Sequence, residues 1–329
     1  MLNKDLHLNE NMFDPKADQV AIREGYGEGL LQAGKDDENV VALSADLTIS
    51  TNTHLFANEF PKRFGEVGIG EQSMASVASG LAAMGKVPFI ASYAMFSPGR
   101  NWEQIRTTIC YNNANVKIAG SHAGVSVGPD GGTHQAIEDI AITRVIPKMH
   151  VIVPCDVHEA KKATLAAAKR KGAFYLRLAK VDTPVMTTED TPFEVGKANT
   201  MWESSDPQVA LIACGTALYA ALLAAKQLDE EGIGSIVVNN ASIKPMDIEK
   251  VIEVAKKTGA VVTAESHQIL GGMGSAVAEV LAQNHPVPQE LIGVHDDFGQ
   301  SGTPEELLAH YKIDAPSIIA AAKKVISRK

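Results

Sequence analysis

The glutamate at position 71 has surroundings that suit proton chemistry. It follows a largely apolar, glycine-containing stretch, residues 64–70, and precedes a run of small residues, 72–80, that is typical of a buried helix. A buried carboxyl group is costly unless it is neutral or pairs with a specific group. Such groups are candidates for acid–base catalysis. Taken alone, Glu71 is more simply interpreted as a helix-start acid stabilised by the helix dipole.

A glycine-rich loop provides a second group of candidate residues. Residues 121–135 contain four glycines, His122, His134 and Asp130, and they follow an apolar run of strand type. Ligands of open α/β sheets bind at the carboxyl ends of strands, and glycine lets backbone approach a ligand closely. Imidazole and carboxylate groups suit hydrogen bonding to a polyhydroxy substrate. Either histidine alone would suit the surface of a turn, but the three residues together favour a binding site. Their spacing does not suit a metal, so no metal ligand is predicted.

Further charged residues are candidates for anion or cofactor contacts. Arg177 lies inside an apolar strand-like run, where a guanidinium needs an anion, either a phosphate or a buried carboxylate. Arg23, in the first expected helix, is open to the same two interpretations. Asp46 follows an apolar run and is expected in a turn or cap, with a cofactor contact as the alternative. The glycines of residues 271–274 open a helix and suit either anion binding or close helix packing.

The elements that must position these residues alternate between strand and helix along the whole chain, which predicts a parallel α/β architecture. The expected strands are residues 40–45, 87–94, 116–121, 150–154, 174–178, 209–214, 235–239, 260–264 and 291–294. The expected helices are residues 15–33 with Asp14 as N-cap, 101–111, 135–144, 159–170, 217–231, 247–257 and 274–282, followed by two closing helices. An irregular stretch at 183–193 is the expected linker between a domain at 12–182 and a smaller one at 194–329.

Composition excludes several classes of protein. The chain has 329 residues, 45% apolar content and a net charge of −9 without a clustered basic face, which argues against nucleic-acid binding. The three cysteines form neither a disulfide framework nor a metal motif, so reduced thiols and a cytoplasmic location are expected. No signal-peptide core and no membrane-spanning run is present.

Two motifs resemble the thiamine-diphosphate enzymes of the transketolase family. They are residues 64–74, Phe-Gly-Glu-Val-Gly-Ile-Gly-Glu-Gln-Ser-Met, and residues 128–135, Gly-Pro-Asp-Gly-Gly-Thr-His-Gln. The resemblance extends from about residue 17 to the end and covers the pyrimidine-binding and C-terminal domains. The family's N-terminal domain, whose Gly-Asp-Gly…Asn motif grips the diphosphate through Mg²⁺, has no counterpart here. The resemblance therefore implies the C-terminal half of a split transketolase, with the Mg²⁺ ligands on a separate N-terminal subunit.

The same resemblance assigns cofactor contacts. Glu71 matches the glutamate that bonds N1′ of the aminopyrimidine of thiamine diphosphate and drives its 4′-amino group toward the imino form. Phe96 matches the ring that stacks on the aminopyrimidine. Tyr93 and Arg100 are expected in the same pocket, and Asp46 near the cofactor. The implied catalytic residues are Glu71, His122 and His134.

Substrate contacts carry over in the same way. His122 and His134 would contact the sugar, and Asp130 would read the configuration of a donor hydroxyl. The residues implied at the phosphate end are Arg23, Ser50 and Arg177. Such an anion clamp would hold the sugar in register for attack. Two positions depart from the family pattern: Gly132 replaces a common proline, and Gly99 stands where some members carry an aromatic residue.

The implied activity is transfer of a two-carbon ketol unit from a ketose phosphate to an aldose phosphate, as in the pentose phosphate pathway. A self-associated dimer is expected as the core of a heterotetramer with the N-terminal subunit, and the C-terminal domain is expected to stabilise it. The alternatives are the β-subunit of a 2-oxo-acid dehydrogenase, a deoxyxylulose-phosphate synthase half, a split enzyme for a branched or sulfonated ketose, and a catalytically silent assembly subunit.

Overall fold

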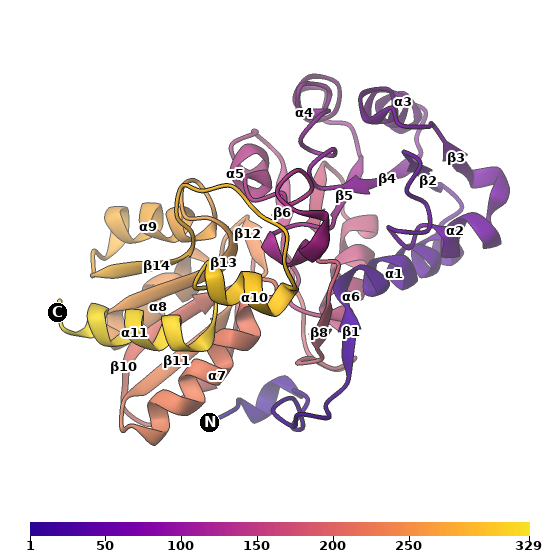
Figure 1. Cartoon of the computed structure of the whole chain (residues 1–329). Coiled ribbons are helices and arrows are strands. Elements are labelled where there is room, and N and C mark those ends of the chain that lie inside the picture. Colours follow the sequence, from indigo (N-terminus) through magenta and orange to yellow (C-terminus); the bar gives the residue numbers. More distant parts are fainter.

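Two mostly parallel sheets form the framework of the computed structural model, which describes residues 1–329 (Figure 1). The larger sheet has seven strands in the order β12-β6-β7-β5-β4-β2-β3. The smaller has five in the order β14-β13-β10-β11-β9. Helices flank both sheets, so the predicted α/β class with two domains is confirmed.

The first sheet gathers the apolar runs of the first half of the chain. Its parallel strands are β2 Val40–Ser44, β3 Phe64–Glu66, β4 Val87–Tyr93, β5 Lys117–Ser121, β6 His150–Ile152 and β7 Phe174–Arg177. Its helices are α1 Ile22–Asp36, α2 His54–Glu59, α3 Glu71–Ala83, α4 Trp102–Gln104, α5 Asp139–Arg144 and α6 Val157–Lys169. The central strands are buried along their length, as strands covered on both faces must be.

The second sheet is built in the same way. Its parallel strands are β10 Pro207–Ala213, β11 Gly234–Asn239, β13 Val261–Gln268 and β14 Gln289–Val294, with β9 Asn199–Glu203 antiparallel at one edge. Its helices are α7 Ala217–Glu230, α8 Ile248–Thr258, α9 Met273–Asn284, α10 Pro304–His310 and α11 Ala315–Ile326. Helices α7 and α11 contribute to one apolar cluster on this sheet, and α8 and α9 contribute to another.

The two domains are joined by a shared sheet and a shared apolar cluster. Strand β12, Ser242–Lys244, belongs to the second half of the chain but pairs antiparallel with β6 of the first sheet. One apolar cluster contains Ile140 and Val151 from the first domain together with Ile212 and Val238 from the second. Because this cluster crosses the boundary, the two domains pack as one unit.

Some expected elements are wrong in their bounds. The first helix begins at Ile22 rather than near residue 15, because β1 Gln19–Ala21 pairs with β8 Asp182–Pro184. Strand β8 also overlaps the first two residues of the expected irregular linker. Asp14 accepts a bond from the Lys16 backbone N–H and so closes a turn instead of capping the helix. The helix expected at 101–111 continues from α4 as a π-helical segment, Ile105–Tyr111.

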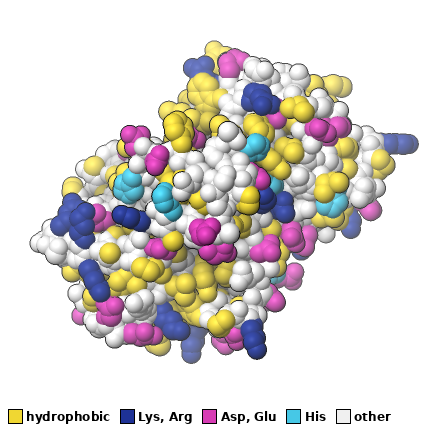
Figure 2. Space-filling view, viewed as in Figure 1, with side chains coloured by type: hydrophobic (Ala, Val, Ile, Leu, Met, Phe, Trp, Pro, Cys, Tyr) yellow, Lys and Arg dark blue, Asp and Glu magenta, His cyan; other side chains and the backbone are white.

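Short 3-10 segments complete the chain: Lys4–Leu6, Pro61–Arg63 and Val125–Asp130. The last of these lies inside the glycine-rich loop, where the sequence predicted no regular structure. None of the helices combines the length and apolarity needed to cross a bilayer. On the face drawn in Figure 2, acidic and basic side chains are interspersed rather than gathered in a basic stripe.

Candidate active site

The candidate residues gather at the carboxyl edge of the first sheet. Strands β4, β5 and β7 are neighbours, and the parallel register pairs Tyr93 with Ser121 and Gly120 with Arg177. The chain after each of these strands therefore leaves the sheet at the same edge. Residues far apart in the sequence meet there, as expected for a ligand site in an open α/β sheet.

Glu71 is the first residue of α3, as the sequence predicts, and it is buried, with 1% of its surface exposed. Its Oε1 accepts a bond from Ser92 Oγ at 3.1 Å, and its Oε2 pairs with Arg100 Nη1 at 2.6 Å. Its backbone carbonyl accepts a bond from Asn101 Nδ2 at 3.1 Å. The carboxylate is thus fixed in position by side chains from the end of β4 and the turn that follows.

An aromatic cluster lies beside this carboxylate. The rings of Tyr93 and Phe96 stack with centroids 6.2 Å apart. The guanidinium carbon of Arg100 lies 4.7 Å from the Phe96 centroid while the same group bonds Glu71. A planar cation thus contacts both the acid and the ring face, and these are the two contacts that an aminopyrimidine requires. The Glu71 carboxylate and the Phe96 ring therefore fit the pyrimidine end of thiamine diphosphate.

His122 is held as a neutral imidazole. It is buried, its Nδ1 lies 2.8 Å from Ser121 Oγ, and its ring stacks on Tyr93 at 3.8 Å between centroids. Burial, together with the positive charges of Arg23 and Lys180, lowers the pKa of His122 from 6.5 to about 3. At neutral pH this side chain can exchange hydrogen bonds with a sugar hydroxyl without carrying a charge.

His134 joins the same cluster from the far end of the loop. Its ring meets Phe96 edge-on with centroids 5.5 Å apart, and Tyr93 edge-on at 6.2 Å. Its Nδ1 lies 2.9 Å from Thr133 Oγ1. The fold thus brings Glu71, the aromatic rings and both predicted histidines into one contiguous cluster.

A lysine that sequence reasoning missed faces the loop. The Nζ of Lys180 lies 3.1 Å from Asp130 Oδ2 and 3.4 Å from the Val127 carbonyl. About a third of each charged side chain is exposed, so the pair is screened and leaves both groups accessible to a ligand. The available signal was its place three residues beyond β7, at the same sheet edge as the other candidates.

Arg23 and Ser50, both expected at the phosphate end, lie together in the structure. Arg23 Nη1 donates to the Ser50 carbonyl at 2.9 Å, while Arg23 Nε is buried without a partner. A buried guanidinium N–H without an acceptor is costly and suits an anion. Because Arg23 and Lys180 both act on the pKa of His122, the positive charges converge on that end of the site.

The phosphate contact predicted for Arg177 is wrong in this structure. Its Nε and Nη2 bind the carboxylate of Asp139 at 2.7 and 3.1 Å, and Nη2 also donates to the carbonyls of Ala136 and Ser266. Tyr175 donates to the same carboxylate at 2.6 Å. Burial alone would raise the pKa of Asp139, but the charge of Arg177 holds that pKa below its ordinary value. Of the two anions that the sequence left open, the buried carboxylate is the partner.

Asp46 is a turn residue, as the simpler interpretation predicted. It has a φ of +59°, and its backbone N–H donates to Glu66 Oε1 at 2.7 Å. Its side chain is exposed at the end of β2, on the same sheet edge as the aromatic cluster.

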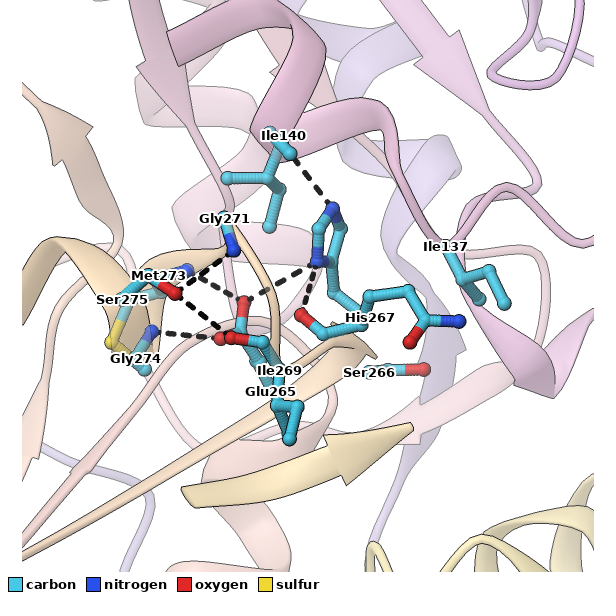
Figure 3. A network of polar contacts seen from close by, with 12 residues as sticks. Ile137, Ile140, Glu265, Ser266, His267, Ile269, Gly271, Met273, Gly274 and Ser275 are labelled. Atoms are coloured by element: carbon cyan, nitrogen blue, oxygen red, sulfur yellow. Dashed lines mark hydrogen bonds and ion pairs between the residues drawn. The ribbon is translucent and has the colours of Figure 1, made fainter. Parts of the chain in front are cut away.

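The helix start at residues 271–274 already binds an anion from its own chain. The backbone N–H groups of Met273 and Gly274 each donate to the Glu265 carboxylate at 2.7 Å (Figure 3). Burial raises the pKa of Glu265, while these two bonds oppose that shift. The group that this helix start binds is therefore the Glu265 carboxylate of the same chain, and the helix start belongs to the domain interior.

Both departures from the family pattern have local steric reasons. A Cβ at Gly132 would lie 2.4 Å from the Gly299 carbonyl oxygen, and one at Gly99 would lie 2.0 Å from the Met95 carbonyl oxygen. Neither position accepts a side chain in this backbone. The chain contains no cluster of three or more His, Cys, Asp or Glu side chains placed to bind a metal ion.

Comparison with known proteins agrees with this arrangement. Residues 18–185 match the family model of the transketolase pyrimidine-binding domain, and residues 196–318 match that of the transketolase C-terminal domain. A protein of Methanocaldococcus jannaschii described as a transketolase C-terminal section is 45% identical over 308 residues, which is 93% of this chain and 95% of that protein.

Two further relatives are similar over nearly their whole length. The 6-deoxy-6-sulfo-D-fructose transketolase subunit SqwH of Clostridium sp. is 39% identical over 96% of this chain and 98% of its own. A solved structure described as a split-gene transketolase, inactive β4 tetramer, is 44% identical, covers 94% of this chain and 99% of that chain, and has a TM-score of 0.87.

Longer transketolases match over only part of their length. The human enzyme is 34% identical over 313 residues, and the chain spans 50% of it. The two family models, the full-length relatives and the geometry of the site agree on one assignment. The chain belongs to the transketolase family and corresponds to the C-terminal section found in its split members.

Proposed function

We propose that this chain is the C-terminal subunit of a split transketolase, active with a separate subunit that binds the diphosphate and Mg²⁺. The observation that carries the proposal is the buried carboxylate of Glu71 beside Phe96, with two histidines on the same aromatic cluster. A related split-gene chain is inactive as a β4 tetramer, which supports a requirement for the second subunit.

Glu71 would bind and release a proton at N1′ of the aminopyrimidine, with Ser92 and Arg100 keeping its carboxylate aimed. Bound thiamine diphosphate would supply the stabilised carbanion that carries the two-carbon unit. Phe96 and Tyr93 would orient the ring, and Asp46 would approach the cofactor from the end of β2. The burial of Glu71 keeps bulk water from the proton.

The substrate would lie across the loop of residues 121–135. His122, neutral at physiological pH, and His134 would bond sugar hydroxyls, and Asp130 would read the configuration of one of them. The phosphate would meet Arg23, Ser50 and Lys180, with Lys180 taking the role first predicted for Arg177. The aldose phosphate that accepts the ketol unit would bind at this same loop.

The chain would form a dimeric core, bind its N-terminal subunits as a heterotetramer and act in the cytoplasm on sugar phosphates. The relatives named above are transketolases, which favours ketol transfer over the 2-oxo-acid alternative. Since one relative is a sulfosugar enzyme, a sulfonated ketose belongs on the assay panel.

The test is reconstitution with a Glu71→Gln variant. The chain is mixed with the N-terminal subunit, thiamine diphosphate and Mg²⁺, and ketol transfer is assayed with a panel of ketose phosphates. Because the amide cannot exchange a proton, the variant should lose at least about 100-fold in kcat while assembling normally. The matched control is Glu159→Gln, which changes another buried glutamate, outside the site, and should stay active. Near-normal turnover by Glu71→Gln would overturn the assignment.

A further inference from the structure

The second domain binds the loop that carries the sugar contacts. We call residues 121–135 the substrate loop, and residues 265–268 at the end of β13 the β13 tip. The backbone N–H of Val125 donates to Ser266 Oγ at 3.2 Å, and the carbonyl of Ser266 accepts a bond from Arg177 at 2.8 Å. The start of the substrate loop is thus tied to a strand of the other domain.

The β13 tip also forms hydrogen bonds with the segment that follows the substrate loop. The backbone N–H of Gln268 donates to the Ile137 carbonyl at 2.8 Å, and that of Ala141 donates to His267 Nε2 at 3.3 Å. Since His267 Nε2 is an acceptor, its proton lies on Nδ1 and is donated to the Gln268 carbonyl at 2.7 Å. Figure 3 shows this ring between the β13 tip and the start of α5.

A second segment of the C-terminal domain holds the other side of the loop. Gln135 Nε2 donates to the carbonyl of Val125, within the loop, and to that of Gln300, across the boundary, both at 3.0 Å. Ser301 Oγ donates to the Pro129 carbonyl at 3.1 Å. Gln135 is 2% exposed, so its amide forms a buried connection between the two domains.

The contact is close enough to fix the backbone of the loop. A Cβ at Gly124 would lie 2.4 Å from Ser266 Oγ, and one at Gly299 would lie 1.7 Å from Gln135 Oε1. The loop itself has little regular structure, and it contains residues at positive φ, including His122 at +59° and Gly128 at +84°. Such a conformation persists only where its surroundings impose it.

We propose that the C-terminal domain sets the conformation of the substrate loop, with Gln135 as the central positioning residue. The domain would thereby determine where His122, Asp130 and His134 meet the sugar, although none of its own residues is placed on the sugar. The substrate part of this inference rests on the proposed function, whereas the conformational part does not.

The conformational part is tested by hydrogen exchange on the chain as it assembles by itself. Gln135→Met keeps the volume and removes both bonds of the amide, so amides of residues 121–135 should exchange about tenfold faster. The matched control is Gln289→Met, which loses bonds from Gln289 Nε2 to Gly274 and Thr263 at 2.9 and 3.3 Å but lies away from the loop. Unchanged exchange in the loop, or equal acceleration in the control, would overturn the proposal.

The substrate part is tested in the reconstituted complex. Gln135→Met should raise the KM for the ketose phosphate about tenfold, with a smaller change in kcat and unchanged affinity for thiamine diphosphate. Gln289→Met should leave all three quantities near wild type. If the wild-type complex shows no ketol transfer, the proposed function fails, and the exchange experiment still decides the conformational claim. A normal KM together with a loosened loop would overturn the specificity role.

Discussion

At the scale of single residues, the candidate site combines a buried acid with a neutral imidazole. Glu71 is buried and bonded by Ser92 and Arg100, whereas His122 is kept neutral by burial and by neighbouring positive charge. The cations that depress the pKa of His122 are Arg23 and Lys180. The same two charges that keep this imidazole neutral are therefore available for an anionic substrate end.

The role of Lys180 gives a prediction at this scale. Lys180→Met removes the charge beside Asp130, so the KM for a phosphorylated donor should rise about tenfold while an unphosphorylated ketose is affected far less. Steady-state kinetics of the reconstituted complex with both donors measures the difference. The matched control is Lys171→Met, an exposed lysine on the first domain outside the site. An equal loss with both donors would contradict the anion contact.

At the scale of elements, the Arg177–Asp139 pair joins β7 to the start of α5. Both side chains are nearly inaccessible, at 7% and 1% exposed, and Tyr175 completes the set of bonds to the carboxylate. The pair also reaches the second domain through the Ser266 carbonyl. Its position in the sheet interior explains why an arginine lies in an otherwise apolar strand.

This placement predicts a stability effect rather than a substrate effect. Arg177→Met would leave Asp139 buried without its cation, which should lower the free energy of unfolding by about 3–5 kcal/mol. Urea unfolding of the purified chain measures the loss. The double variant Arg177→Met, Asp139→Asn should recover part of it, because no charge then remains buried. A stable single variant that selectively loses phosphorylated substrates would restore the original phosphate interpretation.

The sequence predicted local features better than distant partners. Glu71 starts a helix and is buried, and the two histidines contact one aromatic cluster, as their local context indicated. The partner of Arg177 lies 38 residues away in sequence, so the strand alone left two anions open. The first helix starts late because β1 pairs with a strand more than 160 residues further along the chain. Contacts of this range carry no local signal.

At the scale of the whole molecule, the boundary between domains contains a buried titratable group. Glu159 of α6 accepts bonds from the Cys155 backbone N–H at 2.8 Å and from Asn239 of β11 at 2.8 Å. Burial and the neighbouring charge of Asp156 raise the pKa of Glu159 from 4.5 to about 7. Ionisation of this side chain is therefore coupled to the packing of one domain on the other.

The coupling predicts how stability changes with pH. Because the folded pKa of Glu159 exceeds the unfolded value, its contribution is complete below about pH 4.5 and is lost as pH rises through about 7. The difference in free energy of unfolding between wild type and Glu159→Gln should change by up to about 3 kcal/mol over that window. Urea titrations at several pH values measure it, and a difference independent of pH would contradict the assignment.

The crossing strand β12 has a consequence for any attempt to dissect the chain. Removal of β12 would leave β6 as an exposed edge strand of the larger sheet, with unpaired backbone groups that other chains can bind. The apolar cluster behind it would also be cut through, exposing first-domain side chains such as Ile140 and Val151. A fragment ending at the linker should therefore aggregate, because the first domain depends on the second to cover its sheet edge and its apolar cluster.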